Sequence, residues 1–225
     1  NFGIDASLFK MLDLNIDLFS DKRKGILVET AGSISGVIGV DRPYSSAGIV
    51  SNKGIEIALN LHKTTGDLNY HLTAQLSYSK NEIVDMLEVY RPFDYLKRTG
   101  QSINQAFGLE AVGFFTDATD IAASPKQTFS IVRPGDIKYK DQNNDNIINS
   151  FDEVPIGYST QLPQLYFSGS VGIEFKGVSI EADLQGIANQ TVYLNTPSIF
   201  WPLRSNTSIS TYSNDAWTPA TASTA

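Results

Sequence analysis

The chain contains no cysteine and only two histidines, His62 and His71. The lack of cysteine excludes disulfides, zinc–thiolate sites and cysteine nucleophiles, and two histidines argue against a multi-histidine metal site. Hydrophobic residues make up 41% of the sequence, too few for a helical membrane protein, and no apolar run is long enough to form a spanning helix. The formal net charge of −7 argues against a nucleic-acid partner, which requires a basic surface.

Both ends of the sequence lack the signals of a natural terminus. The stretch NFGIDASLFK has no initiator methionine, and it has neither the charged nor the apolar region of a signal peptide. The stretch NDAWTPATASTA ends in loop-like sequence. We therefore expect the chain to be a fragment of a longer protein.

Apolar and polar residues alternate in six segments, and this period of two predicts β-strands with one apolar and one polar face. Short connections join the strands into three predicted hairpins. The segments are residues 2–9, 11–21, 54–62, 68–79, 165–175 and 178–186.

Long connections separate the hairpins, at about residues 23–50, 83–163 and 187–225, and they are rich in Gly, Ser, Asn, Asp and Pro. Tight turns on one side and long loops on the other are typical of outer-membrane β-barrels. Charges on the polar face are compatible with a water-filled barrel interior. Aromatic residues near the strand ends are compatible with a girdle of aromatic side chains at the membrane–water interface. The charged residues are Asp17, Glu56, Glu181 and Asp183, and the aromatic ones are Phe19, Tyr70, Tyr78, Phe167 and Phe175.

The predicted fold class is therefore all-β, with antiparallel hairpins forming part of a large transmembrane β-barrel. A barrel with a polar interior needs more than six strands, which agrees with a partial chain. A soluble antiparallel sandwich would show the same alternation of apolar and polar residues. It would not explain why the turns are tight on one side and the loops are long on the other.

Several segments, in order, resemble SusC/RagA-type TonB-dependent outer-membrane transporters. The most specific block is VRPGDIKYKDQNNDNIINSFDEVPIG at 132–157, which is similar to a Pro-Gly-Asp block of that family. The other similar segments are NKGIEIAL at 52–59, FGLEAVGFFTDATDIAASP at 107–125, the strand–turn–strand at 162–194 and NDAWTP at 214–219. The matching segments cover most of the chain, and the resemblance implies that residues 1–225 form a partial barrel without the plug and the last strands.

The resemblance implies energised import across the outer membrane of a Gram-negative bacterium. In this family a large barrel holds a plug, and a SusD-type lipoprotein caps the extracellular mouth. TonB acts on the missing N-terminal region, and the substrate is an oligosaccharide or a peptide. Outer-membrane lipid would surround the barrel, and nucleic acid would not be a partner.

A loop with the spacing of a calcium site lies inside the most specific block. Calcium prefers hard oxygen ligands, and an EF-hand-type loop supplies them from positions 1, 3, 5, 7, 9 and 12. Counted from Asp141, these positions are Asp141, Asn143, Asp145, the carbonyl of Ile147, Asn149 and Asp152. Asn146 replaces the preferred glycine at position 6, and asparagine tolerates the left-handed conformation. The alternative is a turn whose Asx side chains cap their own backbone, so Ca²⁺, if bound, would be structural.

Three aromatic residues of the last connection are candidates for stacking on sugar: Trp201, Tyr212 and Trp217. Packing of the loop is the alternative role for them. His62 and His71 fall on the polar faces of neighbouring strands, where a hydrogen-bonded wall role is expected.

No enzyme signature is present. The sequence contains no GxSxG, HExxH or phosphate-binding glycine loop, and the adjacent acids Asp152 and Glu153 do not form a glycosidase pair. We therefore interpret the chain as non-enzymatic. The second functional hypothesis is a secreted, calcium-stabilised β-sandwich that binds carbohydrate.

Overall fold

The computed structural model describes residues 1–30, 39, 43–197 and 208–221. The chain divides into two compact units. The first comprises residues 1–91, 97–105 and 157–191, and the second comprises residues 92–96, 106–156 and 192–225. Among the described residues, no helix is both long and apolar enough to cross a membrane.

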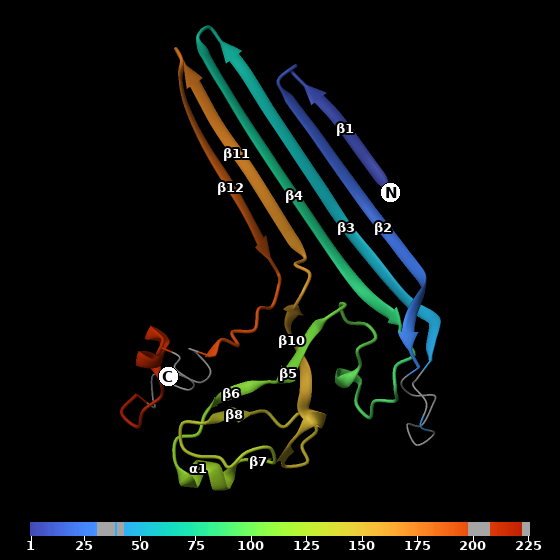
Figure 1. The fold of residues 1–225 in the computed structure, drawn as a ribbon, viewed down its shortest axis with the longest axis vertical. Coiled ribbons are helices and arrows are strands. Elements are labelled where there is room, and N and C mark those ends of the chain that lie inside the picture. Colours follow the sequence, from blue (N-terminus) through green and yellow to red (C-terminus); the bar gives the residue numbers. More distant parts are fainter. Residues whose placement is uncertain (31–38, 40–42, 198–207, 222–225) are drawn as a thin grey trace. The chain divides into compact units, whose positions relative to one another are not determined.

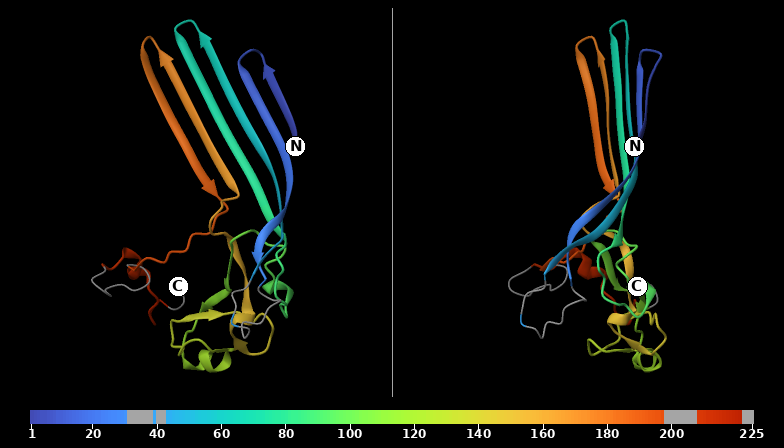
Figure 2. Two further views of the ribbon diagram at one scale, coloured as in Figure 1. Left: turned by 45° about the vertical axis from the view of Figure 1, so that its right-hand side comes forward. Right: turned by 90° about the vertical axis from the view of Figure 1, so that its right-hand side faces the viewer.

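The first unit is a six-stranded antiparallel sheet in the order β1-β2-β3-β4-β11-β12 (Figure 1). The two side views of Figure 2 show its long strands running together. The three predicted hairpins are confirmed, and β4 pairs with β11 although the chain between them is long. The strands are β1 (Phe2–Leu8), β2 (Leu12–Glu29), β3 (Tyr44–Thr65), β4 (Leu68–Asp85), β11 (Leu165–Phe175) and β12 (Val178–Ala188).

Two of the hairpin turns have both central residues in the left-handed region. Phe9 and Lys10 have φ angles of 55° and 57°, and Lys176 and Gly177 have φ angles of 49° and 81°. Paired positive φ angles match the right-handed twist of the flanking strands. These turns fix the register of β1 on β2 and of β11 on β12.

The register keeps the alternation in phase across the whole sheet. Ile57 pairs with Ile16 on one side and with Leu76 on the other, whereas Glu56 pairs with Asp17 and Ser77. Because neighbouring residues of a strand point to opposite faces, one face is apolar and the other polar. We call them the apolar face and the polar face.

The side chains of the apolar face are exposed, and the face is about as long as a membrane-spanning strand. On β11 the apolar positions run over the full 11 residues from Leu165 to Phe175, and spanning strands have about 9–11 residues. Leu72, Ile173, Ile180 and Leu184 are 40%, 52%, 74% and 66% exposed. Every buried hydrophobic residue among the described residues lies outside this sheet.

The strands run further into the connections than the alternation predicts. β2 ends at Glu29 and β3 begins at Tyr44, so both enter the loop predicted at 23–50. After Leu18 the next alternate positions of β2 are the polar residues Ser20, Lys22 and Lys24, so the alternation of apolar and polar residues is interrupted while the backbone ladder to β3 continues.

The girdle position expected for Phe19 is wrong. Phe19 pairs with Gly54 and shares the polar face with Asp17, because it lies one residue after Leu18. A Cβ added to Gly54 would lie 2.4 Å from the Phe19 ring, so the ring covers this glycine. Tyr78 does lie on the apolar face, opposite Ile55.

The connection predicted at 83–163 is largely a folded unit of short elements. Its two-stranded sheets pair β10 with β5, β6 with β8, and β7 with β9. Its small core contains Leu96, Ala106, Phe115 and Ile148. The elements are η2 (Asp94–Leu96), β5 (Gln105–Leu109), β6 (Ala111–Phe114), α1 (Ala118–Ala123), β7 (Lys126–Gln127), β8 (Ile137–Tyr139), β9 (Ile147–Ile148), η3 (Ser150–Asp152) and β10 (Glu153–Ser159), and η5 (Thr211–Asp215) follows in the last connection.

Candidate functional site

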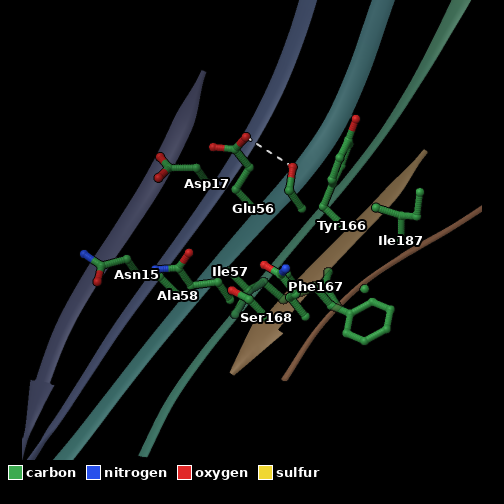
Figure 3. A pocket seen from close by; sticks show the side chains of 14 residues that line it. Asn15, Asp17, Glu56, Ile57, Ala58, Tyr166, Phe167, Ser168 and Ile187 are labelled. Carbon is green, nitrogen blue, oxygen red and sulfur yellow. Dashed lines mark hydrogen bonds between the residues drawn. The ribbon is translucent and has the colours of Figure 1, made fainter. Parts of the chain in front are cut away.

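A groove of about 820 Å³ lies on the sheet of the first unit (Figure 3). The strand register aligns Asp17, Glu56, Ser77 and Tyr166 in one row across β2, β3, β4 and β11. The Ser77 hydroxyl donates a hydrogen bond of 3.3 Å to Glu56 Oε1. The row presents carboxylates, a hydroxyl and a phenol to the same space, so the groove is suited to a solute that donates hydrogen bonds.

The polar face carries charge of one sign. From the hairpin turns to the row of Gly54, its described positions include no lysine or arginine. The carboxylates on this face are Asp5, Asp13, Asp17, Glu56, Glu174, Glu181 and Asp183. Such a surface attracts cationic groups and repels anions.

The two histidines lie opposite each other on the polar face, as expected from the sequence. His62 pairs with His71, and the same row continues through Gly172 to Glu181. A Cβ on Gly172 would lie 2.2 Å from the His71 ring, so the glycine leaves room for the imidazole. His71 Nε2 lies 3.5 Å from Glu181 Oε1. This contact links β4 to β12 across Gly172 of β11. The hydrogen-bonded wall role expected for both histidines stays a prediction.

The predicted calcium loop is held by hydrogen bonds from its own backbone. Asp141 accepts the backbone N–H groups of Asn144 at 2.7 Å and Asn146 at 2.8 Å. Asp145 accepts the N–H of Ile147 at 2.8 Å. Asn146 has a φ of 62°, so asparagine does adopt the left-handed conformation at position 6. These contacts are those of an Asx-capped turn.

Asp152 is fully buried and faces the start of the same loop. Its carboxylate accepts the N–H of Gln142 at 2.9 Å and the N–H of Asn149 at 2.9 Å. The Asn149 side chain in turn accepts the N–H of Phe151, which completes a capping box at η3. Asp152 and Asn149 therefore cap a 3₁₀ turn.

The oxygen ligands predicted from the sequence lie in one loop. Their presence in one loop does not by itself show that they point to a common cation. In the described part of the chain, no group of three or more acidic or histidine side chains is arranged to hold a metal ion. The loop still offers the hard amide, carboxylate and carbonyl oxygens that calcium prefers. Calcium binding by Asp141, Asn143, Asp145, Ile147, Asn149 and Asp152 stays a prediction.

The negative charge of this loop affects the neighbouring side chain of Tyr95. Tyr95 donates a hydrogen bond of 2.8 Å from its hydroxyl to the carbonyl of Phe151. Burial, together with the charges of Asp152, Asp141 and Asp145, raises the pKa of Tyr95. The Tyr95 phenol therefore stays neutral and keeps its donor role.

The loop is also tied to Glu110, which lies between β5 and β6. Gln142 Nε2 donates to Glu110 Oε2 at 2.8 Å, and Lys140 Nζ donates to the same atom at 3.1 Å. Hydrogen bonds from Gln142 and then Lys140 lower the pKa of Glu110. The Glu110 carboxylate thus stays ionised and fixes the entry to the loop.

The structure places the aromatic candidates differently. Tyr212 is 68% exposed, whereas Trp201 lies outside the described residues. Trp217 is half-buried and its ring lies against Gly135, where an added Cβ would come within 2.4 Å. The Trp217 indole nitrogen is buried and has no hydrogen-bond partner. Trp217 thus packs against the loop at Gly135, and sugar stacking by Trp201, Tyr212 and Trp217 stays a prediction.

An aromatic cluster was missed by the sequence reasoning. Phe93 stacks on Tyr95 with ring centroids 5.3 Å apart, and it meets Phe151 edge-on at 6.3 Å. Only Phe151 lies inside the Pro-Gly-Asp block, and no periodicity in the sequence marks Phe93 or Tyr95.

No protein-family model matches the chain. The chain is 25% identical over 209 residues to the TonB-dependent receptor P26 of Formosa agariphila, covering 86% of this chain and 20% of that protein. Its fold is similar to solved structures of the RagAB peptide importer. The closed-closed state matches with a TM-score of 0.59 and 18% identity over 84% of this chain, and the open-open state with a TM-score of 0.59 and 17% identity over 81%.

These comparisons confirm two predictions from the sequence. The chain resembles SusC/RagA-type TonB-dependent transporters, and its antiparallel hairpins have the fold of part of such a transporter's barrel. The chain spans about a fifth of the length of the proteins it matches.

Proposed function

We propose that this chain, with its resemblance to SusC/RagA-type transporters, forms part of the barrel wall of an outer-membrane importer in a Gram-negative bacterium. The apolar face would contact lipid and the polar face would line the lumen. The second unit would belong to the extracellular loops. The complete protein would take up its substrate with energy delivered through TonB.

The observation that carries this proposal is the unburied apolar face of the six-stranded sheet. A soluble protein would lose free energy by leaving so many large apolar side chains in water. In a bilayer the same side chains contact acyl chains, and the antiparallel ladder satisfies the backbone within the sheet.

The same observation does not support the β-sandwich hypothesis. A sandwich buries one face of each sheet under the other. In the part of the chain that the structure describes, the other sheets have two strands each, and the side chains of the apolar face stay exposed.

Peptides are the first substrate class to test, because the structural neighbours are described as peptide importers. Oligosaccharides are the second. A SusD-type lipoprotein would act as the lid, as the name RagAB indicates a two-component importer. We infer no covalent step, since the relatives are transporters and a receptor.

The experiment is uptake by cells that carry or lack the complete gene. Labelled peptide mixtures and labelled oligosaccharides are supplied separately, with and without a functional TonB. The proposal expects TonB-dependent accumulation of one substrate class that disappears with the gene. Uptake that is unchanged in the gene deletion would contradict the proposal. Recovery of the protein in a soluble fraction without detergent would contradict it as well.

A further inference from the structure

Two lysines face each other across β3 and β4 at one end of the apolar face. Lys53 pairs with Lys80 in the strand register, and both side chains are exposed. They lie one step beyond Ile55 and Tyr78 on the same face. Like charges directly opposite each other destabilise a sheet, so this pair calls for a counter-charge.

The described residues offer no such counter-charge in an ion pair with either lysine. None of the ion pairs formed by the described residues includes Lys53 or Lys80. Lys22 on β2 adds positive charge on the same face, opposite Ser51. Glu82 also pairs with Ser51, but it lies one row farther from the apolar positions than the lysine pair.

A hollow of about 490 Å³ accompanies the lysine pair. Its apolar lining includes Leu18, Ile55 and Tyr78, and its polar lining includes Ser51, Lys53, Lys80 and Glu82, so two ammonium groups outnumber one carboxylate. The hollow therefore combines a surface for an acyl chain with a surface for an anion. Lysine stems can lie along apolar surface while the ammonium groups reach a charged layer.

The geometry points to a binding site for the phosphate headgroup of a membrane lipid at Lys53 and Lys80, with its acyl chain along Ile55 and Tyr78. The inference rests on the proposed function, because it requires the apolar face to lie in a membrane. The site faces the leaflet on the side of the long connections, which is the outer leaflet in a barrel of this kind. The lipid phosphate supplies a counter-charge to the lysine pair.

The same face offers a matched control at its other end. Lys63 also lies on β3 and on the apolar face, but its register partner is Tyr70, so it has no second lysine opposite. Lys80→Gln removes one charge of the pair, and Lys63→Gln removes an isolated charge. Both changes keep a polar side chain of similar length.

The test measures thermal unfolding of the complete protein in zwitterionic detergent, with lipid A or inorganic phosphate added. In detergent alone, Lys80→Gln should raise the midpoint because it relieves the repulsion. Lipid A should raise the midpoint of the wild type more than that of Lys80→Gln, and the variant's affinity for lipid A should fall about fivefold. Lys63→Gln should respond to lipid A as the wild type does.

Two results would overturn the site. One is an equal response of the two variants to lipid A, and the other is equal stabilisation by inorganic phosphate, which would indicate a free-anion site. Insertion of the wild type into phosphatidylcholine vesicles is measured separately. If the protein inserts but lipid A has no effect on it, only the lipid site fails, whereas loss of insertion rejects the proposed function as well.

Discussion

The change Ala74→Arg places a charge at the middle of the apolar face. Ala74 pairs with Leu59 and with Gly169, midway between the rows of Tyr70 and Tyr78. Its exposed side chain is small, so the substitution removes few native contacts and mainly adds a guanidinium. The change therefore isolates the environment of the face.

The expected cost follows from depth in the bilayer. An arginine on the lipid face near the midplane of a barrel costs about 2–4 kcal/mol. That free energy corresponds to a roughly 30-fold to 700-fold loss in the folding equilibrium constant. In water, a surface substitution of this kind changes stability by about 0.5 kcal/mol or less.

The matched control is Ala58→Arg. Ala58 pairs with Asn15 and Gln75 and lies on the polar face, in the row next to Glu56. There the new charge meets water and nearby carboxylates, so we expect little loss of stability. The assay is urea unfolding of the complete protein in phosphatidylcholine vesicles, followed by heat-modifiable migration on gels. Equal destabilisation by both variants, or tolerance of Ala74→Arg, would refute the assignment of the faces.

Three further predictions concern the connections. Burial favours a higher pKa for Glu88, but its carboxylate accepts the N–H groups of Thr99 and Arg98 at 2.9 and 2.7 Å, and the net effect lowers the pKa. This stabilisation is present above the unfolded pKa and is lost as the pH falls through the lower folded value. The protection of the Arg98 amide against exchange, relative to its intrinsic rate, should therefore fall in acid, below the ordinary Glu pKa of 4.5, and this pH dependence should disappear in Glu88→Gln. Gly135→Ala should displace the Trp217 ring, because φ is 92° and the added Cβ has no room, and red-shifted indole emission would report it. Calcium should slow amide exchange in residues 141–152, and Asp145→Ala should abolish the response; exchange that is unchanged by calcium would reject the predicted ion site.

The strands and hairpins were predictable because their signals are local. A period of two over residues 68–79 needs only neighbouring residues, and the tight turn at Lys176–Gly177 is set by the residues that form it. Once the hairpins form, a single register keeps every apolar residue on one face, since a slip by one residue would reverse the faces.

The remaining features depend on contacts distant in sequence. Nearness to a strand end suggests a girdle position for Phe19, but its position one residue after Leu18 places it on the polar face. The folded unit within 83–163 is held by burial of Phe115, Ile148 and Asp152, which no short pattern reveals. Asp152 has the spacing of a metal ligand, and only the structure shows that its oxygens cap backbone N–H groups.

The central claim is that one face of the sheet contacts lipid and the other contacts water. The most direct measurement is spin-label accessibility along β4 of the complete protein in vesicles, using single cysteines introduced into a segment that has none of its own. Collision with oxygen should be high at Leu72, Ala74 and Leu76, and collision with a water-soluble nickel chelate should be high at Thr73, Gln75 and Ser77. Accessibilities that rise and fall together along the strand would contradict the account.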